Sequence, residues 1–187
     1  MFTNNWFATT GGDKNFEKYI LPLYPIASEC LEVGCYEGRA SVWLMENTQS
    51  ELTVIDTFKG GEDLPDEKDL LKRFKENIEP YKERIKIVEG TSSEKLKELA
   101  PNFFDFIYID GSHLAKNVLE DAVLAFPLLR EGGIMIFDDY TWGIGRLPLL
   151  ELPVTGIDAF LFVYADQLEI LEKNSQCIIR KKVMPIQ

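Results

Sequence analysis

Residues 29–43 read ECLEVGCYEGRASVW: a short apolar segment, a turn bounded by glycines, and the start of a helix. In open α/β sheets such a unit places a ligand beyond the carboxyl end of the strand. A dinucleotide-binding turn has the pattern G-x-G-x-x-G, whose second glycine lets the backbone approach a diphosphate. Counted from Gly34, the later glycine positions hold Tyr36 and Arg39. The turn therefore disfavours a dinucleotide and favours a nucleoside with a compact polar tail.

Two acids follow successive apolar segments and extend this interpretation. Gly34 and Gly38 allow close approach of a ligand or a positive φ. Glu32 can accept hydrogen bonds from an ammonium group. Asp56 ends the next apolar segment, about 20 residues further on, where an acid can accept hydrogen bonds from ribose hydroxyls. The alternative is that both acids only satisfy neighbouring backbone donors.

The composition predicts one globular domain that does not bind long polyanions. The 187 residues fit a single domain, and a hydrophobic content of 45% supports a packed core. The net charge of −11 disfavours nucleic acid and anionic membranes as partners. We find neither a secretory leader nor an apolar run of membrane-spanning length, so we expect a cytoplasmic protein. Three cysteines without metal-ligand spacing agree with a reducing compartment.

Apolar runs typical of buried parallel strands alternate with segments of helical periodicity. Strands are predicted at 29–33, 52–56, 84–88, 104–110 and 133–139, and helices at 66–78, 113–126 and 154–165. Residues 168–181 read as two strands joined by a turn around 173–175. We therefore expect an open α/β sheet that ends in an antiparallel hairpin, without a domain boundary.

At these residues the chain resembles the class I S-adenosylmethionine-dependent methyltransferases. LEVGCYEGR (31–39) is similar to their acid-x-Gly-x-x-x-Gly motif, VIDTF (54–58) to their second acidic motif, and EGTSSEKL (89–96) to their adenine-side loop. The resemblance covers nearly the whole chain. It implies a Rossmann-like, seven-stranded, mostly parallel sheet with helices on both faces and a C-terminal antiparallel hairpin. Residues 1–187 would form a single S-adenosylmethionine-binding domain.

The resemblance also implies the cofactor contacts. The residues expected to border the methionine part are Glu32, Gly34, Cys35 and Gly38. Asp56 would bind the ribose, with Thr57 and Phe58 beside the adenine. Further adenine-side candidates are Gly90, Thr91 and Ser92. For Ser93 we favour a purely structural role, as the N-cap of the helix that follows.

Three aspartates suggest a metal. Asp110 ends the fourth predicted strand and Asp138 and Asp139 end the fifth, so adjacent parallel strands would bring them together. Clustered carboxylates repel one another unless protons or cations offset their charge, and oxygen ligands suit Mg²⁺. The pattern resembles divalent-dependent O-methyltransferases, in which acids at these places hold the metal. Alternatively, Asp110 contacts the cofactor's amino group or the substrate, while Asp138 or Asp139 caps the next segment.

His113 is the only histidine, and it lies three residues after Asp110. DGSH (110–113) resembles the Asp-Gly-x-His motif of a small-molecule methyltransferase subfamily. A histidine has an ordinary pKa of about 6.5, so His113 could deprotonate or orient an acceptor hydroxyl at neutral pH. Its alternative is a structural role. Tyr140 and Trp142 either wall the acceptor pocket or pack in the core.

We therefore interpret the chain as an S-adenosylmethionine-dependent methyltransferase that methylates a hydroxyl of a small molecule, with a sugar as one option. Asp110 and His113 would act in catalysis, and Asp110, Asp138 and Asp139 would bind a metal if one is used. Trp6, Phe7 and the TTGG stretch (9–12) suggest that residues 1–26 form a cap or flap. A homodimer could complete the pocket. The alternatives are a nicotinamide-dependent oxidoreductase and a non-catalytic nucleoside-binding protein.

Overall fold

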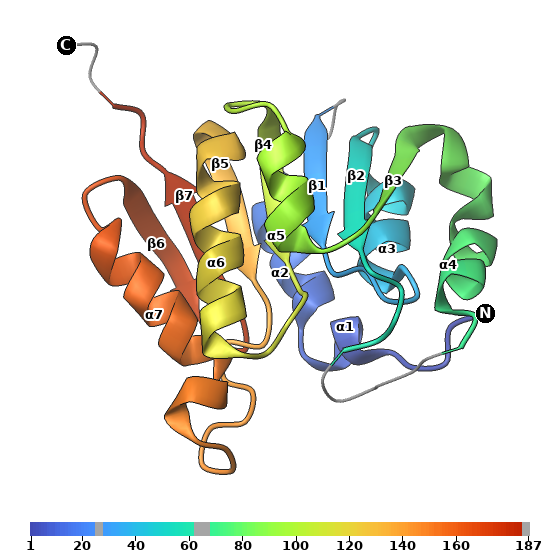
Figure 1. The fold of residues 1–187 in the computed structure, drawn as a ribbon. Coiled ribbons are helices and arrows are strands. Elements are labelled where there is room, and N and C mark those ends of the chain that lie inside the picture. Colours follow the sequence, from blue (N-terminus) through green and yellow to red (C-terminus); the bar gives the residue numbers. More distant parts are fainter. Residues whose placement is uncertain (25–27, 62–67, 185–187) are drawn as a thin grey trace.

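A computed structural model describes residues 1–24, 28–61 and 68–184 and shows a seven-stranded sheet between two layers of helices (Figure 1). The strands are β1 (Glu29–Val33), β2 (Glu51–Asp56), β3 (Ile85–Glu89), β4 (Phe104–Ile109), β5 (Leu129–Phe137), β6 (Leu168–Lys173) and β7 (Cys177–Lys181). They lie in the order β3-β2-β1-β4-β5-β7-β6. The pairs from β3 to β5 are parallel, and β7 is antiparallel to both β5 and β6. The predicted fold class is confirmed.

Helices cover both faces of the sheet because the central strands are apolar on both sides. The helices are α1 (Trp6–Thr9), α2 (Gly12–Tyr19), α3 (Arg39–Asn47), α4 (Leu70–Ile78), α5 (Ser92–Lys95), α6 (Ala115–Ala125) and α7 (Pro153–Val163). The short 3₁₀ segments are Glu79–Arg84, Leu96–Glu98, Phe126–Leu128 and Leu149–Glu151. One core contains Val118 of α6 and Phe160 of α7; the other contains Phe16 of α2, Leu44 of α3 and Phe74 of α4.

The strand order determines where a ligand can bind. From β1 the chain proceeds to β2 and β3 on one side, and then returns to β4 on the other side of β1. Such a reversal leaves a crevice at the carboxyl ends of β1 and β4. Main-chain hydrogen bonds continue the ladder by one residue, from Asp110 to Val33 and from Asp138 to Ile109. The three aspartates therefore lie just beyond the strands, at the rim of this crevice.

The structure differs from the predicted elements mainly at their ends. β4 and β5 stop at Ile109 and Phe137, before the aspartates that we placed inside strands. Thr91, not Ser93, is the N-cap residue of α5, so our prediction for Ser93 is wrong. We predicted no helix near the N-terminus, yet α1 and α2 form there. Residues 25 and 26 of the predicted cap, and residues 66 and 67 of a predicted helix, lie outside the described residues.

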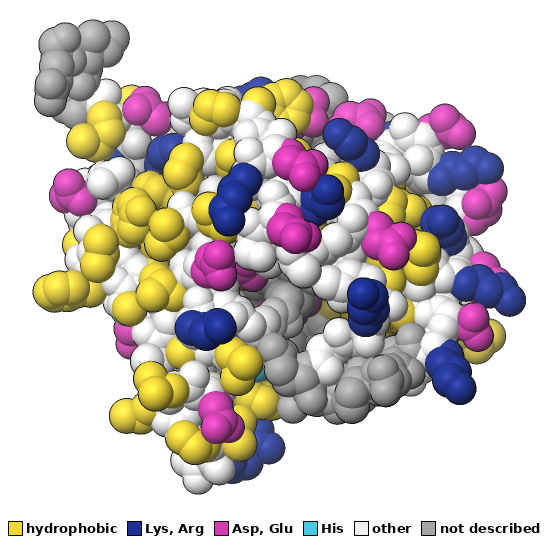
Figure 2. Space-filling model, in the orientation of Figure 1, with side chains coloured by type: hydrophobic (Ala, Val, Ile, Leu, Met, Phe, Trp, Pro, Cys, Tyr) yellow, Lys and Arg dark blue, Asp and Glu magenta, His cyan; other side chains and the backbone are white. Residues whose placement is uncertain are grey.

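The exposed side chains are unevenly distributed. In Figure 2 hydrophobic side chains gather over α7 and the segment 143–152 that protrudes below it, whereas charged side chains cover much of the rest of this face. Phe162 and Val163 of α7, and Leu149 and Leu150 of the protruding segment, are all exposed. Within the part of the chain that the structure describes, no helix combines the length and hydropathy needed to cross a membrane.

Candidate active site

A cavity of about 740 Å³ opens at the carboxyl ends of β1, β2, β4 and β5. The predicted cofactor residues that line it are Gly34, Asp56, Thr57, Gly90, Thr91, Ser92 and Asp110. The remaining ones, namely Glu32, Cys35, Gly38 and Phe58, are buried, and the described cavity lining does not include them. Trp6, Tyr36, His113 and Trp142 add ring surfaces to the wall. The cavity thus combines aromatic surface with carboxylates and exposed loop backbone.

The turn after β1 is held in conformations that favour glycine. Gly34 and Gly38 have φ values of 80° and 83°, and Tyr36 between them has a φ of 47°. A Cβ on Gly34 would overlap the carbonyl oxygen of Asp110, so two backbone segments meet here without a side chain between them. Tyr36 lies on the cavity wall, at the position where a dinucleotide turn has glycine.

Asp56 connects the turn after β1 with the loop after β2. Its Oδ2 accepts hydrogen bonds from the backbone N–H groups of Cys35 and Tyr36, at 2.8 and 3.0 Å. Its Oδ1 accepts one from the N–H of Phe58, at 2.6 Å. These donors occupy three of the roughly four acceptor positions of a carboxylate. Asp56 therefore satisfies backbone donors, which is the alternative role that we considered. It also lines the cavity.

Glu32 lies behind the cavity wall. Its side chain is buried, and Ser41 of α3 donates a hydrogen bond to its Oε2. Burial raises the pKa of Glu32 to about 8, although the Ser41 hydroxyl opposes this shift. Burial therefore favours the protonated, neutral form of this acid. Its contact with an ammonium group stays a prediction.

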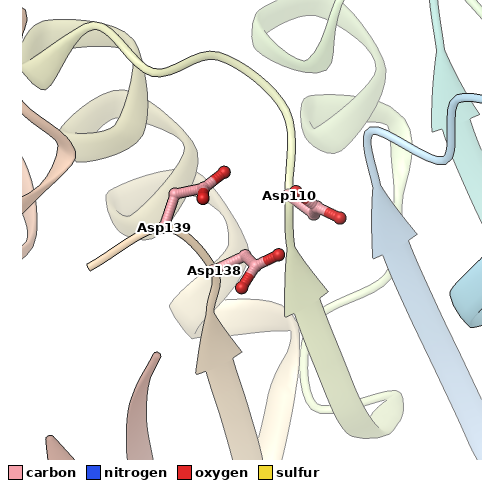
Figure 3. Close-up of side chains that lie close together, drawn as sticks. All are labelled: Asp110, Asp138 and Asp139. Carbon is pink, nitrogen blue, oxygen red and sulfur yellow. The ribbon is translucent and has the colours of Figure 1, made fainter. Parts of the chain in front are cut away.

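The structure brings the three predicted aspartates together (Figure 3). One carboxylate oxygen from each of Asp110, Asp138 and Asp139 lies within 4.8 Å of the others. Asp139 reaches this arrangement with a φ of 55°, in the left-handed region. Burial, and then Asp138, raise the pKa of Asp110 well above its ordinary value. Burial, and then Asp139, raise the pKa of Asp138 to about 6. Proton or cation binding would relieve this repulsion.

Two buried side chains hold Asp138, and our reading of the sequence missed both. The Tyr108 hydroxyl donates to Oδ2 at 2.8 Å, and the Gln176 Nε2 donates to Oδ1 at 2.8 Å. Tyr108 is a strand residue two positions before Asp110, so its place in β4 could have drawn attention to it. Gln176 lies in the turn before β7 and carries no comparable signal in the sequence.

His113 lies beside the aspartates. Its Nε2 is 2.8 Å from Oδ2 of Asp139, and its ring stacks on Trp142 with centroids 4.4 Å apart. Both His113 and Trp142 line the cavity. Tyr140 instead packs against the core and donates a hydrogen bond to Asp158 at 2.9 Å. Of the two aromatic residues, Trp142 therefore matches the pocket-wall interpretation and Tyr140 the core interpretation.

The N-terminal segment contributes to the cavity wall. Trp6, Phe7 and Thr10 line it, and the Trp6 ring lies 5.6 Å from that of Tyr36. Buried Glu37 anchors the segment by accepting hydrogen bonds from the backbone N–H and the hydroxyl of Thr3. The predicted cap is thus next to the site, and its motion stays a prediction.

Asp121 is a further acid that sequence reasoning did not select. It lies in α6 among apolar positions, is 3% exposed, and lines the cavity near Ser92. Burial raises the pKa of Asp121 to about 6, and a hydrogen bond with Ser92 opposes the shift. In the sequence it resembles an ordinary charged helix position, because helical periodicity does not show which neighbouring loop will cover it.

Comparison with known proteins agrees with this geometry. Residues 31–140 match the sequence model of a family described as "Methyltransferase domain". This range includes the turn after β1, Asp56, the loop after β3 and all three clustered aspartates. The sequence-based resemblance to methyltransferases is thereby confirmed.

An uncharacterized protein of Acanthamoeba polyphaga mimivirus is 24% identical over 137 residues, which cover 69% of this chain. The match spans 60% of that longer protein. Among solved structures, the SAH-bound methyltransferase of Podospora anserina has a TM-score of 0.61 at 20% identity, covering 83% of this chain and 72% of that one. An O-methyltransferase from Bacillus cereus in complex with SAH has a TM-score of 0.67 at 18% identity, covering 95% and 82%. At these identities the structural similarity concerns the fold.

Proposed function

Because this chain belongs to the methyltransferase-domain family, we propose that it transfers a methyl group from S-adenosylmethionine to a hydroxyl oxygen of a small molecule. The observation that carries the proposal is that one cavity is bordered by both the turn after β1 and the aspartate cluster. The cofactor would lie along the ends of β1 and β2, and the acceptor beside the ends of β4 and β5.

The residues of the cavity fit an adenosine-containing cofactor. Its volume of about 740 Å³ falls in the range of about 300–1,000 Å³ typical of small-molecule sites. Gly34 lets the ligand approach the backbone where the methionine part would lie. Asp56 retains acceptor capacity for a ribose hydroxyl, and Asp121 beside Ser92 offers a carboxylate to an amino group of the base. Tyr36 on the wall disfavours the diphosphate of a nicotinamide dinucleotide.

The aspartate cluster fits a hard divalent cation such as Mg²⁺. Asp110, Asp138 and Asp139 supply only oxygen donors, and their positions let one oxygen from each face a common point. When bound, S-adenosylmethionine would supply the activated methyl group, and the cation would lower the pKa of the acceptor hydroxyl.

The chain's own contribution is to align the acceptor and to take its proton. The contact with Asp139 and the stacking on Trp142 fix the orientation of the His113 ring at the cavity wall. A base oriented by a carboxylate is suited to accept a proton from a hydroxyl. The indole of Trp142 and the N-terminal Trp6 would shield the reacting groups from water. A small acceptor, with a sugar as one option, fits a cavity that is lined by both aromatic rings and carboxylates. A second copy that completes this wall stays a prediction.

Cofactor binding can be tested by isothermal titration with S-adenosylhomocysteine. We expect Asp56→Ala to weaken binding at least tenfold, because the ribose acceptor and the acceptor for three turn N–H groups are both removed. Asp166→Ala, at an exposed position after α7, is the matched control and should bind like the wild type. Equal affinities of the two variants would contradict the ribose assignment.

The chemistry can be tested by transfer of a labelled methyl group to a panel of hydroxylated small molecules. We expect a chelator to abolish transfer, Mg²⁺ to restore it, and His113→Ala to lower turnover by about 10²-fold or more at neutral pH. Transfer that survives chelation would refute the metal, and normal turnover of His113→Ala would refute the base. Cofactor binding without transfer to any acceptor would favour a nucleoside-binding protein.

A further inference from the structure

A chain of buried hydrogen bonds leads from the N-terminal helix α2 to the aspartate cluster. Gln176 is 0% exposed and Asn15 of α2 is 6% exposed, so their amide groups must find partners within the protein. Asn15 Nδ2 donates to Gln176 Oε1 at 2.8 Å, and Gln176 Nε2 donates to Asp138 Oδ1 at 2.8 Å. The chain thus connects two segments far apart in sequence to one acid of the site.

The direction of these hydrogen bonds is determined by chemistry. A carboxylate only accepts hydrogen bonds, so the amide nitrogen of Gln176 must face Asp138. Asn15 secures this orientation because it donates to the amide oxygen at the other end. The backbone of Gln176 is held as well, since its N–H donates to Oδ1 of Asn174 at 2.9 Å. Gln176 therefore presents a donor to Asp138 from a fixed position.

Asp138 shares the cluster with Asp110 and Asp139, so its orientation would affect a cation bound among the three. In Figure 3 it lies between Asp110 and Asp139. Tyr108 holds one of its oxygens and Gln176 holds the other, which prevents rotation of the carboxylate. Partners that orient a metal ligand commonly change metal affinity by about 10- to 100-fold when removed.

We propose that Gln176, kept in its orientation by Asn15, is a positioning residue that aims the Asp138 carboxylate at a divalent cation. The inference rests on the metal site of the proposed function and adds to it two residues that the described cavity lining does not include. A purely structural role of the same hydrogen bonds would instead lower stability without a selective effect on metal affinity.

The test measures Mn²⁺ affinity by the electron paramagnetic resonance signal of the free ion, with S-adenosylhomocysteine present. We expect Gln176→Leu to weaken Mn²⁺ binding at least tenfold, because Oδ1 of Asp138 loses its donor. Asn15→Asp should have a comparable effect from a greater distance. An aspartate at position 15 accepts where asparagine donates, so the Gln176 amide would turn and present its oxygen to Asp138.

Thr48→Ala is the control for stability. Thr48 is also buried and hydrogen-bonded, but it follows α3 at the opposite end of the sheet from the cavity. It should lower the melting temperature and leave Mn²⁺ affinity unchanged. Binding of S-adenosylhomocysteine within threefold of wild type would show that all variants are folded.

The outcomes separate the two proposals. If the wild type binds Mn²⁺ and both Gln176→Leu and Asn15→Asp bind it equally well, the positioning role is refuted and the metal site stands. If the wild type binds S-adenosylhomocysteine but no Mn²⁺, the metal site and the positioning role are refuted together. If Thr48→Ala weakens Mn²⁺ binding as much as Gln176→Leu does, the effect follows from lost stability and the positioning role is also refuted.

Discussion

At Gly34 both the fold and the site depend on the absence of a side chain. Its φ of 80° suits glycine, and a Cβ would overlap the carbonyl oxygen of Asp110. The left-handed conformation costs about 1 kcal/mol for other residues, and overpacking costs about 1–3 kcal/mol more. We expect Gly34→Ala to lower the free energy of unfolding by about 3 kcal/mol, measured by urea denaturation.

Gly145 provides a control for this expectation. Its φ is 77°, but no atom of the described residues lies within 4 Å of a Cβ placed there. Gly145→Ala should therefore cost only about 1 kcal/mol. Equal losses for the two variants would mean that the backbone conformation alone, and not the approach of Asp110, makes glycine necessary at position 34.

Residue type and position were sufficient to identify most of the acids of the site. Asp56, Asp110, Asp138 and Asp139 each follow an apolar run, and parallel strands place such residues at one edge. Gln176 could not be found in this way. It comes from an antiparallel hairpin whose turn reaches the same edge only because β7 inserts next to β5. Polar residues in turns are common, so the sequence carries no signal for its role.

At the level of elements, the N-terminal segment makes contacts that its local sequence pattern did not predict. TTGG suggested a cap or flap, and in the structure Gly11 is the N-cap of α2, while Gly12 packs so closely on Phe7 that a Cβ there would lie 2.6 Å from its ring. Thr3 and Asn4 are held by Glu37 and Arg39 of the turn after β1 and the start of α3. The cap is therefore joined to the turn that it covers.

Trp6 tests whether this segment takes part in ligand binding. We expect Trp6→Ala to weaken binding of S-adenosylhomocysteine about tenfold, because the variant loses cavity wall and the contact with Tyr36. Isothermal titration measures the effect. Leu23→Ala is the control, since Leu23 is similarly exposed (48% against 52% for Trp6) and the described cavity lining does not include it. A wild-type affinity for Trp6→Ala would exclude Trp6 from cofactor binding.

At the level of the whole molecule, buried acids make stability depend on pH. Burial raises the pKa of Glu32 from 4.5 to about 8, and that of Asp121 from 3.8 to about 6. At pH values between the ordinary and the raised pKa of each acid, the folded protein therefore binds more protons than the unfolded chain. Their contribution to the free energy of unfolding is full below about pH 4 and is lost as the pH rises through about 6 and then about 8.

The expected result is a melting temperature of the ligand-free protein that falls between pH 5.5 and 8.5. Glu32→Gln should flatten this decline, because the amide cannot ionise and still accepts from Ser41. Each unit of pKa displacement corresponds to about 1.4 kcal/mol, so the variant should gain at least about 1 kcal/mol over the wild type at pH 8. Glu131→Gln, at an exposed position, should follow the wild type. Parallel curves for all three proteins would contradict the assignment of a buried, proton-binding Glu32.

The sequence by itself determined the α/β class, the antiparallel end of the sheet, the glycine-bounded turn after β1 and the acids at the strand ends. These features are local, because they follow from periodicity, from glycine positions and from the edge at which parallel strands end. Only the tertiary structure decided that Glu32 is buried behind the cavity, that Asp121 lines it, and that Asn15 and Gln176 reach Asp138. Those properties depend on which distant segments pack together, and the burial and hydrogen bonds that result are set by neighbours that the local sequence does not specify.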